Sequence, residues 1–333
     1  MFLSAVKVGV AIATGVGNNP QQLDAREQAA WQRIEPSVAI VQGLGTARGA
    51  AALIDTRGYF IAHKSVVSAP PMFARLSGGE TVQMERVAID ETTQLVLLKA
   101  QGWISGRRTP ARVISGESPR VQNANQRNAL RLLAALPNGP MRVEMVDADR
   151  PGVMEPSRRM LPLSEIRFEA PTSSVVGALA FTLDGQLAGV LGATLERQDS
   201  LPAMGITQLK SRDAGGFGPV GLTVGYSVSP DILRRVVDGF LSPGHQVLHP
   251  ALGLMCKEAP GSGALVESVQ KGSAAEAAGL RAGDVIVQIN GEDVANQFEY
   301  AKVLLRQKVG ESVQVKIRRG GETLTLPVKV GSG

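Results

Sequence analysis

Short apolar runs separated by glycine-containing turns dominate residues 38–100 of the chain. Two of these turns fall at Arg57-Gly58 and at Gly78-Gly79, and no long helical pattern lies between the runs. Strands of about five residues with regularly spaced turn signals are typical of an antiparallel barrel or sandwich. The pattern therefore predicts a mostly β fold for this part of the chain.

Two stretches in the first half of the chain show a helical spacing of apolar residues. The first, PQQLDAREQAAWQRIEPSV, begins at Pro20 with helix-forming residues and is expected to stop at Pro36. The second, NALRLLAAL at 128–136, is an apolar helical patch within 101–165, the least legible part of the sequence. One helix is therefore expected ahead of the β region and another inside it.

Strand-like segments return in the second half of the larger region. They cover 166–195 and 220–228, on either side of a polar, glycine-rich stretch that is typical of a loop. The run SPDILRRVVDGFL follows and predicts a helix, with Ser229 as its N-cap, Pro230 at the first helical position and Asp231 in the first turn.

The segment SPGHQVLHP at 242–250 has the composition of a linker, and the pattern changes after it. A compact β/α unit follows, in which Ser273 is expected to cap a short helix that Gly279 ends. Its expected elements are strands at 251–257, 263–269 and 284–294, helices at 273–280 and 296–308, and a hairpin at 311–330. The chain is thus expected to divide into an N-terminal segment at 1–35, a larger domain at 36–243 and a smaller one at 244–333.

Composition and charge narrow the class of protein. Of the 333 residues, 44% are hydrophobic and 20% are charged, which indicates a globular chain. The net charge is +5, but the arginine pairs lie far apart along the sequence. Phosphate binding requires several cations on one face, so nucleic-acid binding is not expected.

The thiol and imidazole groups are too few for most metal or redox sites. Cys256 is the one cysteine, so an intramolecular disulfide and a CxxC metal site are both excluded. His245 and His249 are four residues apart but lie between Pro243 and Pro250, in a turn or linker rather than on a helix face. We therefore expect no zinc site and no cofactor.

The first 17 residues, MFLSAVKVGVAIATGVG, are mostly apolar. The run is short for a bilayer-spanning helix, and Lys7 interrupts it. A secretory signal would place its positive charge earlier. Two interpretations stay open: a remnant of a signal or anchor with weak membrane association, or a loose or packed start of the fold.

The C-terminal unit contains the run A-x-x-A-G-L-x-x-G-D-x-I-x-x-I-N-G at 275–291. On this run the unit resembles, over about 80 residues, a PDZ domain of the kind attached to bacterial proteases. Gly279 and Gly283 suit tight turns, and Asn290-Gly291 allows positive φ.

The PDZ resemblance implies a site for peptides. Such domains take up a peptide as an added strand beside a helix, with a short loop holding its end through backbone N–H groups. In an alternative register of the helix, Phe298 and Leu305 face the core instead. The resemblance places the site at the loop Ala251, Leu252, Gly253 and Leu254 and at the helix positions Gln297, Ala301 and Leu304.

Five segments characterise the rest of the chain: RIEPSVAIV, GAAALIDTRGYFIAHKSVV, ARLSGGETVQMERVAIDETTQLVLLKA, SSVVGALAFTLDGQLAGV and VGLTVGYSVSPDILRRVV. Together with the PDZ-like unit, they resemble the high-temperature-requirement (HtrA) serine protease family. They anchor both ends of about 210 residues, whereas residues 101–165 match poorly. The resemblance implies a trypsin-like double antiparallel β-barrel followed by a small α+β PDZ domain.

The three positions of the expected catalytic triad carry other residues. Alignment on GY…VV places the histidine at Ser65, alignment on LVLLKA places the aspartate at Gln94, and alignment on LDG places the serine at Val176. A Ser/His/Asp site needs a hydroxyl, an imidazole and a carboxylate that orients it. Of the family's glycine-rich nucleophile motif only Gly177 is kept, so the site is expected to be vestigial.

An alternative pairs His63 with Ser173 or Ser174, which lie two or three residues before Val176. The favoured hypothesis is a pseudoprotease that acts as scaffold, chaperone or adaptor and binds polypeptide C-termini or exposed apolar segments. The alternative is an active endopeptidase with an atypical Ser/His site; a third hypothesis is a structural protein whose own chain closes the groove. The resemblance also implies the periplasm or envelope and a homotrimer, to which Trp31 could contribute, or a hetero-oligomer with active homologues.

Overall fold

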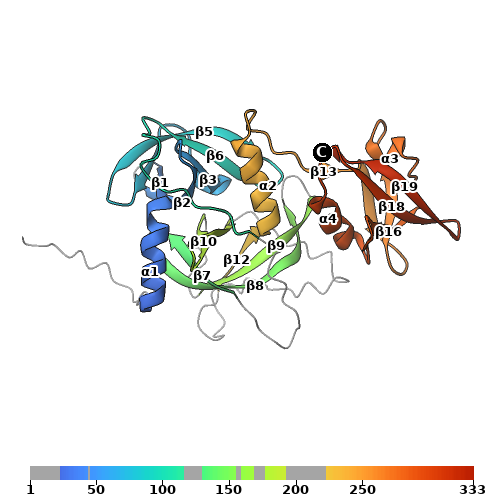
Figure 1. The fold of residues 1–333 in the computed structure, drawn as a ribbon, viewed down its shortest axis with the longest axis horizontal. Coiled ribbons are helices and arrows are strands. Elements are labelled where there is room, and N and C mark those ends of the chain that lie inside the picture. The colour runs from blue at the N-terminus through green and yellow to red at the C-terminus, as the bar shows by residue number, and fades with distance from the viewer. Residues whose placement is uncertain (1–22, 44–45, 116–129, 155–158, 169–176, 193–222) are drawn as a thin grey trace, which may run out of the picture.

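The computed structural model describes residues 23–43, 46–115, 130–154, 159–168, 177–192 and 223–333. Two β-sheets make up the larger lobe, and a smaller lobe of strands and helices follows along the chain (Figure 1). The expectation of a mostly β chain is confirmed. The proposed boundaries after residues 35 and 243 stay predictions.

The first sheet is a closed six-stranded barrel in the order β1-β2-β3-β6-β5-β4. β1 closes the barrel against β4, where Ile40 lies opposite Arg75. The predicted turns are present, and Gly58, Gly78 and Gly79 all have positive φ, which glycine adopts without steric cost. The strands are β1 (Val38–Gly43), β2 (Thr46–Asp55), β3 (Tyr59–His63), β4 (Met72–Leu76), β5 (Thr81–Asp90) and β6 (Leu95–Ala100).

The second sheet has six strands in the order β11-β10-β7-β8-β9-β12. Its two outer strands meet through Ser227 of β12, whose hydroxyl accepts a hydrogen bond from Val190 N of β11 at 3.0 Å. The same hydroxyl donates to Val228 O at 3.0 Å. The strands are β7 (Leu130–Leu136), β8 (Gly139–Met154), β9 (Arg159–Phe168), β10 (Leu179–Thr182), β11 (Leu187–Val190) and β12 (Thr223–Val228).

The helix expected at 128–136 is wrong, because the described part of that stretch is strand β7. Leu133 and Ala135 face the core between the sheets, whereas Leu132 and Ala134 face the interior of the second sheet. Both faces of β7 are therefore buried. A continuous apolar run of this kind lacks the alternation that marks a half-buried strand, and a helical spacing fits it equally well.

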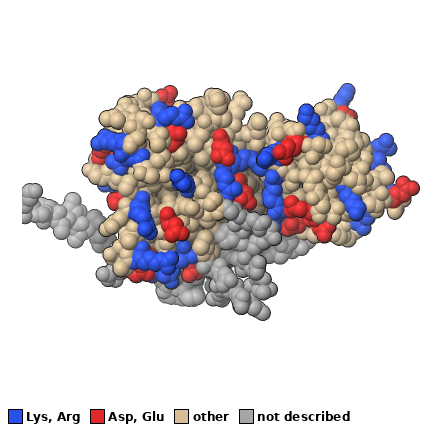
Figure 2. Space-filling model, in the orientation of Figure 1, with Lys and Arg blue, Asp and Glu red and all other residues tan. Residues whose placement is uncertain are grey.

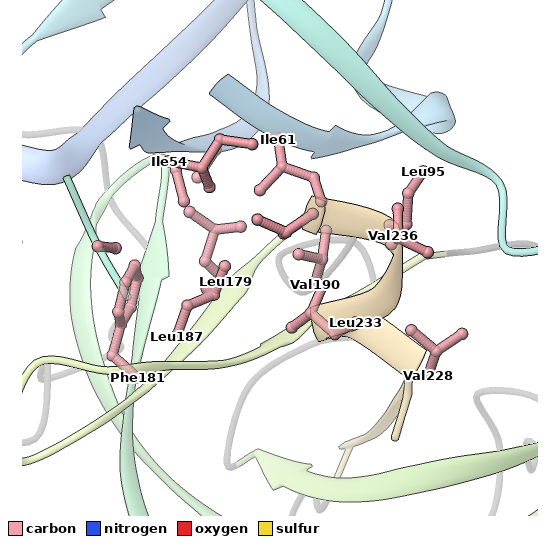
Figure 3. Close-up of a cluster of buried hydrophobic side chains, with 14 of the residues drawn as sticks. Ile54, Ile61, Leu95, Leu179, Phe181, Leu187, Val190, Val228, Leu233 and Val236 are labelled. Atoms are coloured by element: carbon pink, nitrogen blue, oxygen red, sulfur yellow. The ribbon is translucent and has the colours of Figure 1, made fainter. Parts of the chain in front are cut away.

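The main core lies where the two sheets meet α2 (Figure 3). Ile61 and Leu95 reach it from the first barrel, Leu179 and Val190 from the second sheet, and Leu233 from the helix. All five side chains are at most 2% exposed. This shared core fixes the two sheets against each other.

Two helices cover the ends of the larger lobe. α1 (Ala25–Ile34) begins later than Pro20, because Asp24 and Glu27 form a capping box: Glu27 N donates to Asp24 Oδ1 at 2.8 Å and Asp24 N donates to Glu27 Oε2 at 2.9 Å. α2 (Pro230–Leu241) begins as predicted with Pro230. Ser229 occupies its N-cap position without a side-chain capping bond, so the position was right and the capping interaction was not.

The smaller lobe has the expected strands and helices around a second core. Ser273 caps α3 by accepting from Glu276 N at 3.2 Å, and Gly279 ends that helix with positive φ. Gly320 and Gly321 close the predicted hairpin. The elements are β13 (Pro250–Ala251), β14 (Leu254–Glu258), β15 (Ala264–Val269), α3 (Ala274–Ala277), β16 (Val285–Ile289), β17 (Glu292–Asp293), α4 (Gln297–Arg306), β18 (Ser312–Arg319), β19 (Glu322–Lys329) and β20 (Gly331–Ser332).

Charged side chains of both signs are interspersed over the face in Figure 2, and no extended patch of one sign is visible there. Among the helices that the structure describes, none is long and apolar enough to span a membrane. Within the same residues, no group of three or more His, Cys, Asp or Glu side chains is placed to hold a metal ion.

Candidate functional site

A groove of about 1210 Å³ runs along β14 and α4 of the smaller lobe and reaches the start of β9 in the larger one. This volume exceeds the roughly 300–1,000 Å³ of a typical small-molecule pocket, so it has room for a peptide. The structure brings the predicted loop and the predicted helix face together here. All seven predicted residues line the groove: Ala251, Leu252, Gly253, Leu254, Gln297, Ala301 and Leu304.

The loop at one end of the groove is shaped by Gly253. Its φ is +74°, and a Cβ at this position would lie 2.3 Å from the Cβ of Ser273. The carbonyls of Leu252 and Gly253 accept hydrogen bonds from Ala275 N and Gln270 N, each at 2.8 Å. Within the described residues, the N–H groups of Leu252 and Gly253 have no hydrogen-bond acceptor. Two backbone donors therefore remain at this end of the groove.

One side of the groove is an outer strand. β14 pairs with β15 and is the last strand of the sheet β14-β15-β16-β18-β19. An outer strand keeps one row of backbone N–H and C=O groups without a neighbouring strand. Because α4 lies across the groove from it, an extended peptide could pair with β14 and place alternate side chains against the helix.

The α4 wall contains Tyr300, which the sequence prediction missed, and Leu305, which its alternative register had placed, with Phe298, in the core; both Phe298 and Leu305 are buried. Tyr300 and Leu305 line the groove together with Gln297, Ala301 and Leu304. Leu304 also belongs to the core of the smaller lobe, and Leu305 packs into the core shared by the two sheets. Tyr300 follows Gln297 by three residues and precedes Leu304 by four, so the helical spacing could have identified it.

The groove is also lined by Cys256 and by the start of β9, which the sequence analysis did not assign to the site. Cys256 lies on β14, and burial raises the pKa of its thiol to about 12, so the thiol is neutral at pH 7. Arg159, Met160 and Leu161 come from the start of β9. Nothing in the local sequence pattern indicates that β9 would meet the smaller lobe, because that contact depends on tertiary packing.

Two of the three triad positions lie side by side in the structure. Ser65 is in a short 3₁₀ turn (Lys64–Val66) after β3, and Gln94 ends the turn between β5 and β6. Gln94 is 3% exposed with a φ of +59°, and its carbonyl accepts from Lys64 N at 2.8 Å. Val176 lies outside the described residues, as do Ser173 and Ser174.

A carboxylate is present near position 94 but is engaged elsewhere. Asp90 accepts hydrogen bonds from Thr93 Oγ1 at 2.5 Å and from His249 Nε2 at 3.0 Å to each of its oxygens. Burial would raise the pKa of Asp90, but these hydrogen bonds hold it below its usual value. His249 belongs to the segment that enters the smaller lobe, so Asp90 joins the two lobes.

The structure places a serine hydroxyl against an imidazole in this cleft. Ser65 Oγ lies 2.9 Å from Nδ1 of His63, and the Ser65 N–H also donates to that nitrogen at 3.2 Å. His63 is 2% exposed, and burial lowers the pKa of its imidazole to about 4. The ring is therefore neutral near pH 7 and can accept a proton. The alternative in the sequence prediction had paired His63 with Ser173 or Ser174, which lie outside the described residues.

Gly177, the glycine kept from the nucleophile motif, has a packing role. Its φ is +68°, and a Cβ there would lie 2.0 Å from Val66 Cγ1 and 3.3 Å from the Cα of Gly49. Its carbonyl accepts from Ala50 N at 2.8 Å. The backbone of the second sheet thus touches that of the first barrel at this point, which requires glycine whether or not the cleft is catalytic.

The sequence of this chain is similar to a PDZ domain family and to several serine proteases. The PDZ domain family matches residues 190–330. A probable periplasmic serine endoprotease DegP-like of Hahella chejuensis is 24% identical over 298 residues, covering 85% of this chain and 56% of the relative. The serine protease Do-like HtrB of Bacillus subtilis is 25% identical over 291 residues, covering 81% of this chain and 58% of the relative. The chain spans about half the length of these curated relatives.

Solved structures share the fold. The HtrA-type protease AlgW with decapeptide superposes with a TM-score of 0.61 at 17% identity, covering 92% of this chain and 98% of that one. The serine endoprotease from Yersinia pestis superposes with a TM-score of 0.57 at 16% identity, covering 94% and 100%. The expected trypsin-like fold with a PDZ domain is therefore confirmed, and the chain is similar to HtrA-type serine proteases that carry a PDZ domain.

Proposed function

We propose that this chain binds polypeptide C-termini or exposed apolar segments in the groove between β14 and α4, and that its double barrel serves as a scaffold. The observation that carries the proposal is the pair of N–H groups on Leu252 and Gly253, which have no acceptor within the described residues and lie at the end of a groove whose outer strand has one open edge. Buried backbone donors in proteins almost always have a partner, so a peptide carboxylate or turn would satisfy them.

Similar proteins support both the proposed peptide binding and the proposed location. AlgW structures are described with a decapeptide and with a tripeptide, so peptides bind to proteins of this fold. Three relatives are named periplasmic, which supports the expected envelope location. We propose that the chain holds polypeptides there as a chaperone or adaptor, in a homotrimer or together with active homologues.

Fluorescence anisotropy with the full chain tests the peptide site. A labelled peptide with an apolar, free C-terminus is compared with the same peptide amidated at its end. Ala301→Trp fills the groove and is expected to weaken binding at least tenfold, whereas Ala277→Trp, on the exposed surface of α3, leaves it unchanged. Equal binding by the wild type and Ala301→Trp would show that the peptide binds elsewhere.

A second candidate function follows from the 2.9 Å contact between Ser65 and His63. In this reading the Ser65 hydroxyl is the nucleophile and the neutral His63 ring accepts its proton. The hydroxyl of Ser65 stands at the position expected for the family's histidine, and Gln94 supplies an amide where the family has a carboxylate. The scaffold proposal is favoured because Gln94 stands where the resemblance places the orienting carboxylate, and replacing that carboxylate by an amide costs about 10⁴-fold in turnover.

Labelling by a fluorophosphonate probe separates the two functions. We expect no labelling of the native chain above that of a heat-unfolded sample, and no turnover of casein. Labelling that disappears in both Ser65→Ala and His63→Ala would instead establish an atypical serine hydrolase. Gln94→Leu serves as the control, since it alters the same cleft without removing either reacting group.

A further inference from the structure

Tyr300 brings a polar group without a partner into the wall of the groove. Its side chain lines the groove from α4 and is 8% exposed. Within the part of the chain that the structure describes, its hydroxyl takes part in no hydrogen bond. A polar group withdrawn from water without a partner costs free energy, and most buried polar groups in proteins are hydrogen-bonded. A ligand in the groove can supply the missing partner.

The Tyr300 hydroxyl is neutral, and so are the side chains around it. Burial raises its pKa well above the usual value, and the Cys256 thiol raises that pKa further. The hydroxyl therefore keeps its proton at pH 7 and can both donate and accept a hydrogen bond. The residues of β14 and α4 that line the groove carry no charge. A charged ligand side chain would lose water here without gaining an opposite charge.

The alternation of side chains along β14 determines which ligand residue reaches Tyr300. Leu254 and Cys256 pack against the core of the smaller lobe, to which Tyr300 belongs, whereas Met255 between them is 63% exposed. A strand added to β14 has the same alternation, because successive side chains point to opposite faces. A ligand whose end is held at the Gly253 loop therefore places its last side chain beside Leu254 and its third-from-last beside Cys256 and Tyr300.

We infer that Cys256 and Tyr300 line a subsite that selects a neutral hydrogen-bonding side chain, a hydroxyl or a carboxamide, at the third residue from the ligand's C-terminus, and that Tyr300 is its specificity-determining residue. The inference rests on the proposed peptide function and deepens it. An apolar side chain at this place leaves the phenol hydroxyl without a partner, and a carboxylate is desolvated without an ion pair. Gln297 also lines the groove, but its side chain is only half-buried, so water can satisfy its amide.

The test uses the full chain and four labelled peptides of one sequence with a free, apolar C-terminal residue. The third residue from the end is Thr, Val, Asn or Asp, so each of the pairs Thr/Val and Asn/Asp compares side chains of the same shape. The Thr peptide is expected to bind about three- to tenfold more tightly than the Val peptide, and the Asn peptide more tightly than the Asp peptide. The preference for Thr over Val should not change as salt is added, because no charge contributes to it.

Variants assign the preference to a residue. Tyr300→Phe removes only the hydroxyl and is expected to reduce the preference for Thr to less than about twofold, while the affinity for the Val peptide stays within about twofold of the wild type. Because the hydroxyl has no partner in the free chain, thermal unfolding should show no loss of stability. Tyr59→Phe is the matched control, since it makes the same change on β3, outside the groove. Gln297→Met should keep the preference.

Each outcome decides a separate point. If none of the four peptides binds, both the proposed function and this inference are wrong. If the Thr and Val peptides bind with equal affinity, the peptide function stands and the inference fails. If the Asp peptide binds as tightly as the Asn peptide, the selection against charge is wrong. If Tyr300→Phe keeps the full preference for Thr, or if Gln297→Met loses it, the assignment to Tyr300 fails.

Discussion

The triad region, around His63, Ser65 and Gln94, and the PDZ groove differ in which features of the expected sites are present. In the cleft the close backbone contact of Gly177 with Gly49 persists, while the triad positions 65 and 94 carry a serine and a glutamine. In the groove both the backbone shape at Gly253 and the apolar wall are present. Packing constraints alone explain what remains in the cleft, but they do not explain backbone donors left without partners in the groove.

The comparison shows how to separate residues kept for folding from residues kept for binding. A glycine with positive φ appears in both regions, at 177 and at 253. Around Gly177 the carbonyl and the N–H are both hydrogen-bonded, to Ala50 and Leu191. Around Gly253 the carbonyl is bonded and the N–H is not, within the described residues. The incomplete hydrogen bonding, rather than the glycine, distinguishes the proposed binding site.

The largest expected effect comes from cutting the link between the two regions at Asp90. Asp90→Leu leaves His249 Nε2, Thr93 Oγ1 and two backbone N–H groups without their acceptor, which should lower the free energy of unfolding by about 2–4 kcal/mol. Urea unfolding measures the loss. Glu91→Gln is the matched control, because the Glu91 pair with Lys64 is exposed and should contribute less than about 1 kcal/mol.

Measuring peptide affinity on Asp90→Leu tests whether the groove depends on the larger lobe. A loss of affinity in Asp90→Leu at temperatures where the variant is folded would show that the groove depends on the larger lobe. An unfolding free energy within 1 kcal/mol of the wild type would contradict the view that the Asp90–His249 pair holds the lobes together.

The second effect is a pH dependence that belongs to the cleft. The pKa of His63 falls from its usual 6.5 to about 4 on folding, so the folded state disfavours the proton. The resulting stability is present above pH 6.5 and is lost as the pH falls towards 4. From pH 7 to pH 4, His63 should account for about 3 kcal/mol of lost unfolding free energy.

His63→Gln should flatten this part of the stability profile, measured by urea unfolding at both pH values. Carboxylates titrate over the same range, so the quantity compared is the difference between the wild type and the variant. His245→Gln, at a half-buried ring in the linker, is the control. A profile that His63→Gln leaves unchanged would mean that the imidazole takes up its proton as readily in the folded chain as in the unfolded one.

The smallest effect is expected at the contact between α2 and the smaller lobe. Burial lowers the pKa of Arg235, and its Nη1 has no hydrogen-bond partner within the part of the chain that the structure describes, so part of its charge is poorly compensated. Arg235→Met keeps the length and gives up one bond to Gln307 O. The change in unfolding free energy should stay within about 1 kcal/mol, because the lost bond and the relieved desolvation offset each other. A loss above 2 kcal/mol would make Arg235 a principal link between the lobes.

The sequence predicted most of the local structure because local rules act there. Glycine pairs at positive φ located the hairpins, and Ser273 with Gly279 gave both ends of α3. The Asp24–Glu27 capping box was present in the sequence and would have placed the start of α1 correctly. The β7 segment was assigned wrongly because burial on both faces removes the period-two signal.

The site was predictable only in part. The helical spacing and the loop glycine located the groove, but Arg159 joins it through the docking of β9, and His249 meets Asp90 across 159 residues of sequence. Neither contact can be recognised from the spacing or the composition of the sequence. The Ser65–His63 contact, by contrast, spans two residues and follows from the 3₁₀ turn after β3, which the sequence pattern did not indicate.

The burial of His249 limits how the smaller lobe can move. The segment from 242 onwards has the composition of a flexible tether, but its end is fixed inside the larger lobe at 2% exposure. Only Pro250 separates His249 from Ala251, and an extended chain covers roughly 3.3–3.6 Å per residue. Flexibility of residues 242–248 therefore does not extend to the loop at 251–254. A rotation of the smaller lobe has to occur about residue 249, or it has to withdraw the His249 ring from its buried position.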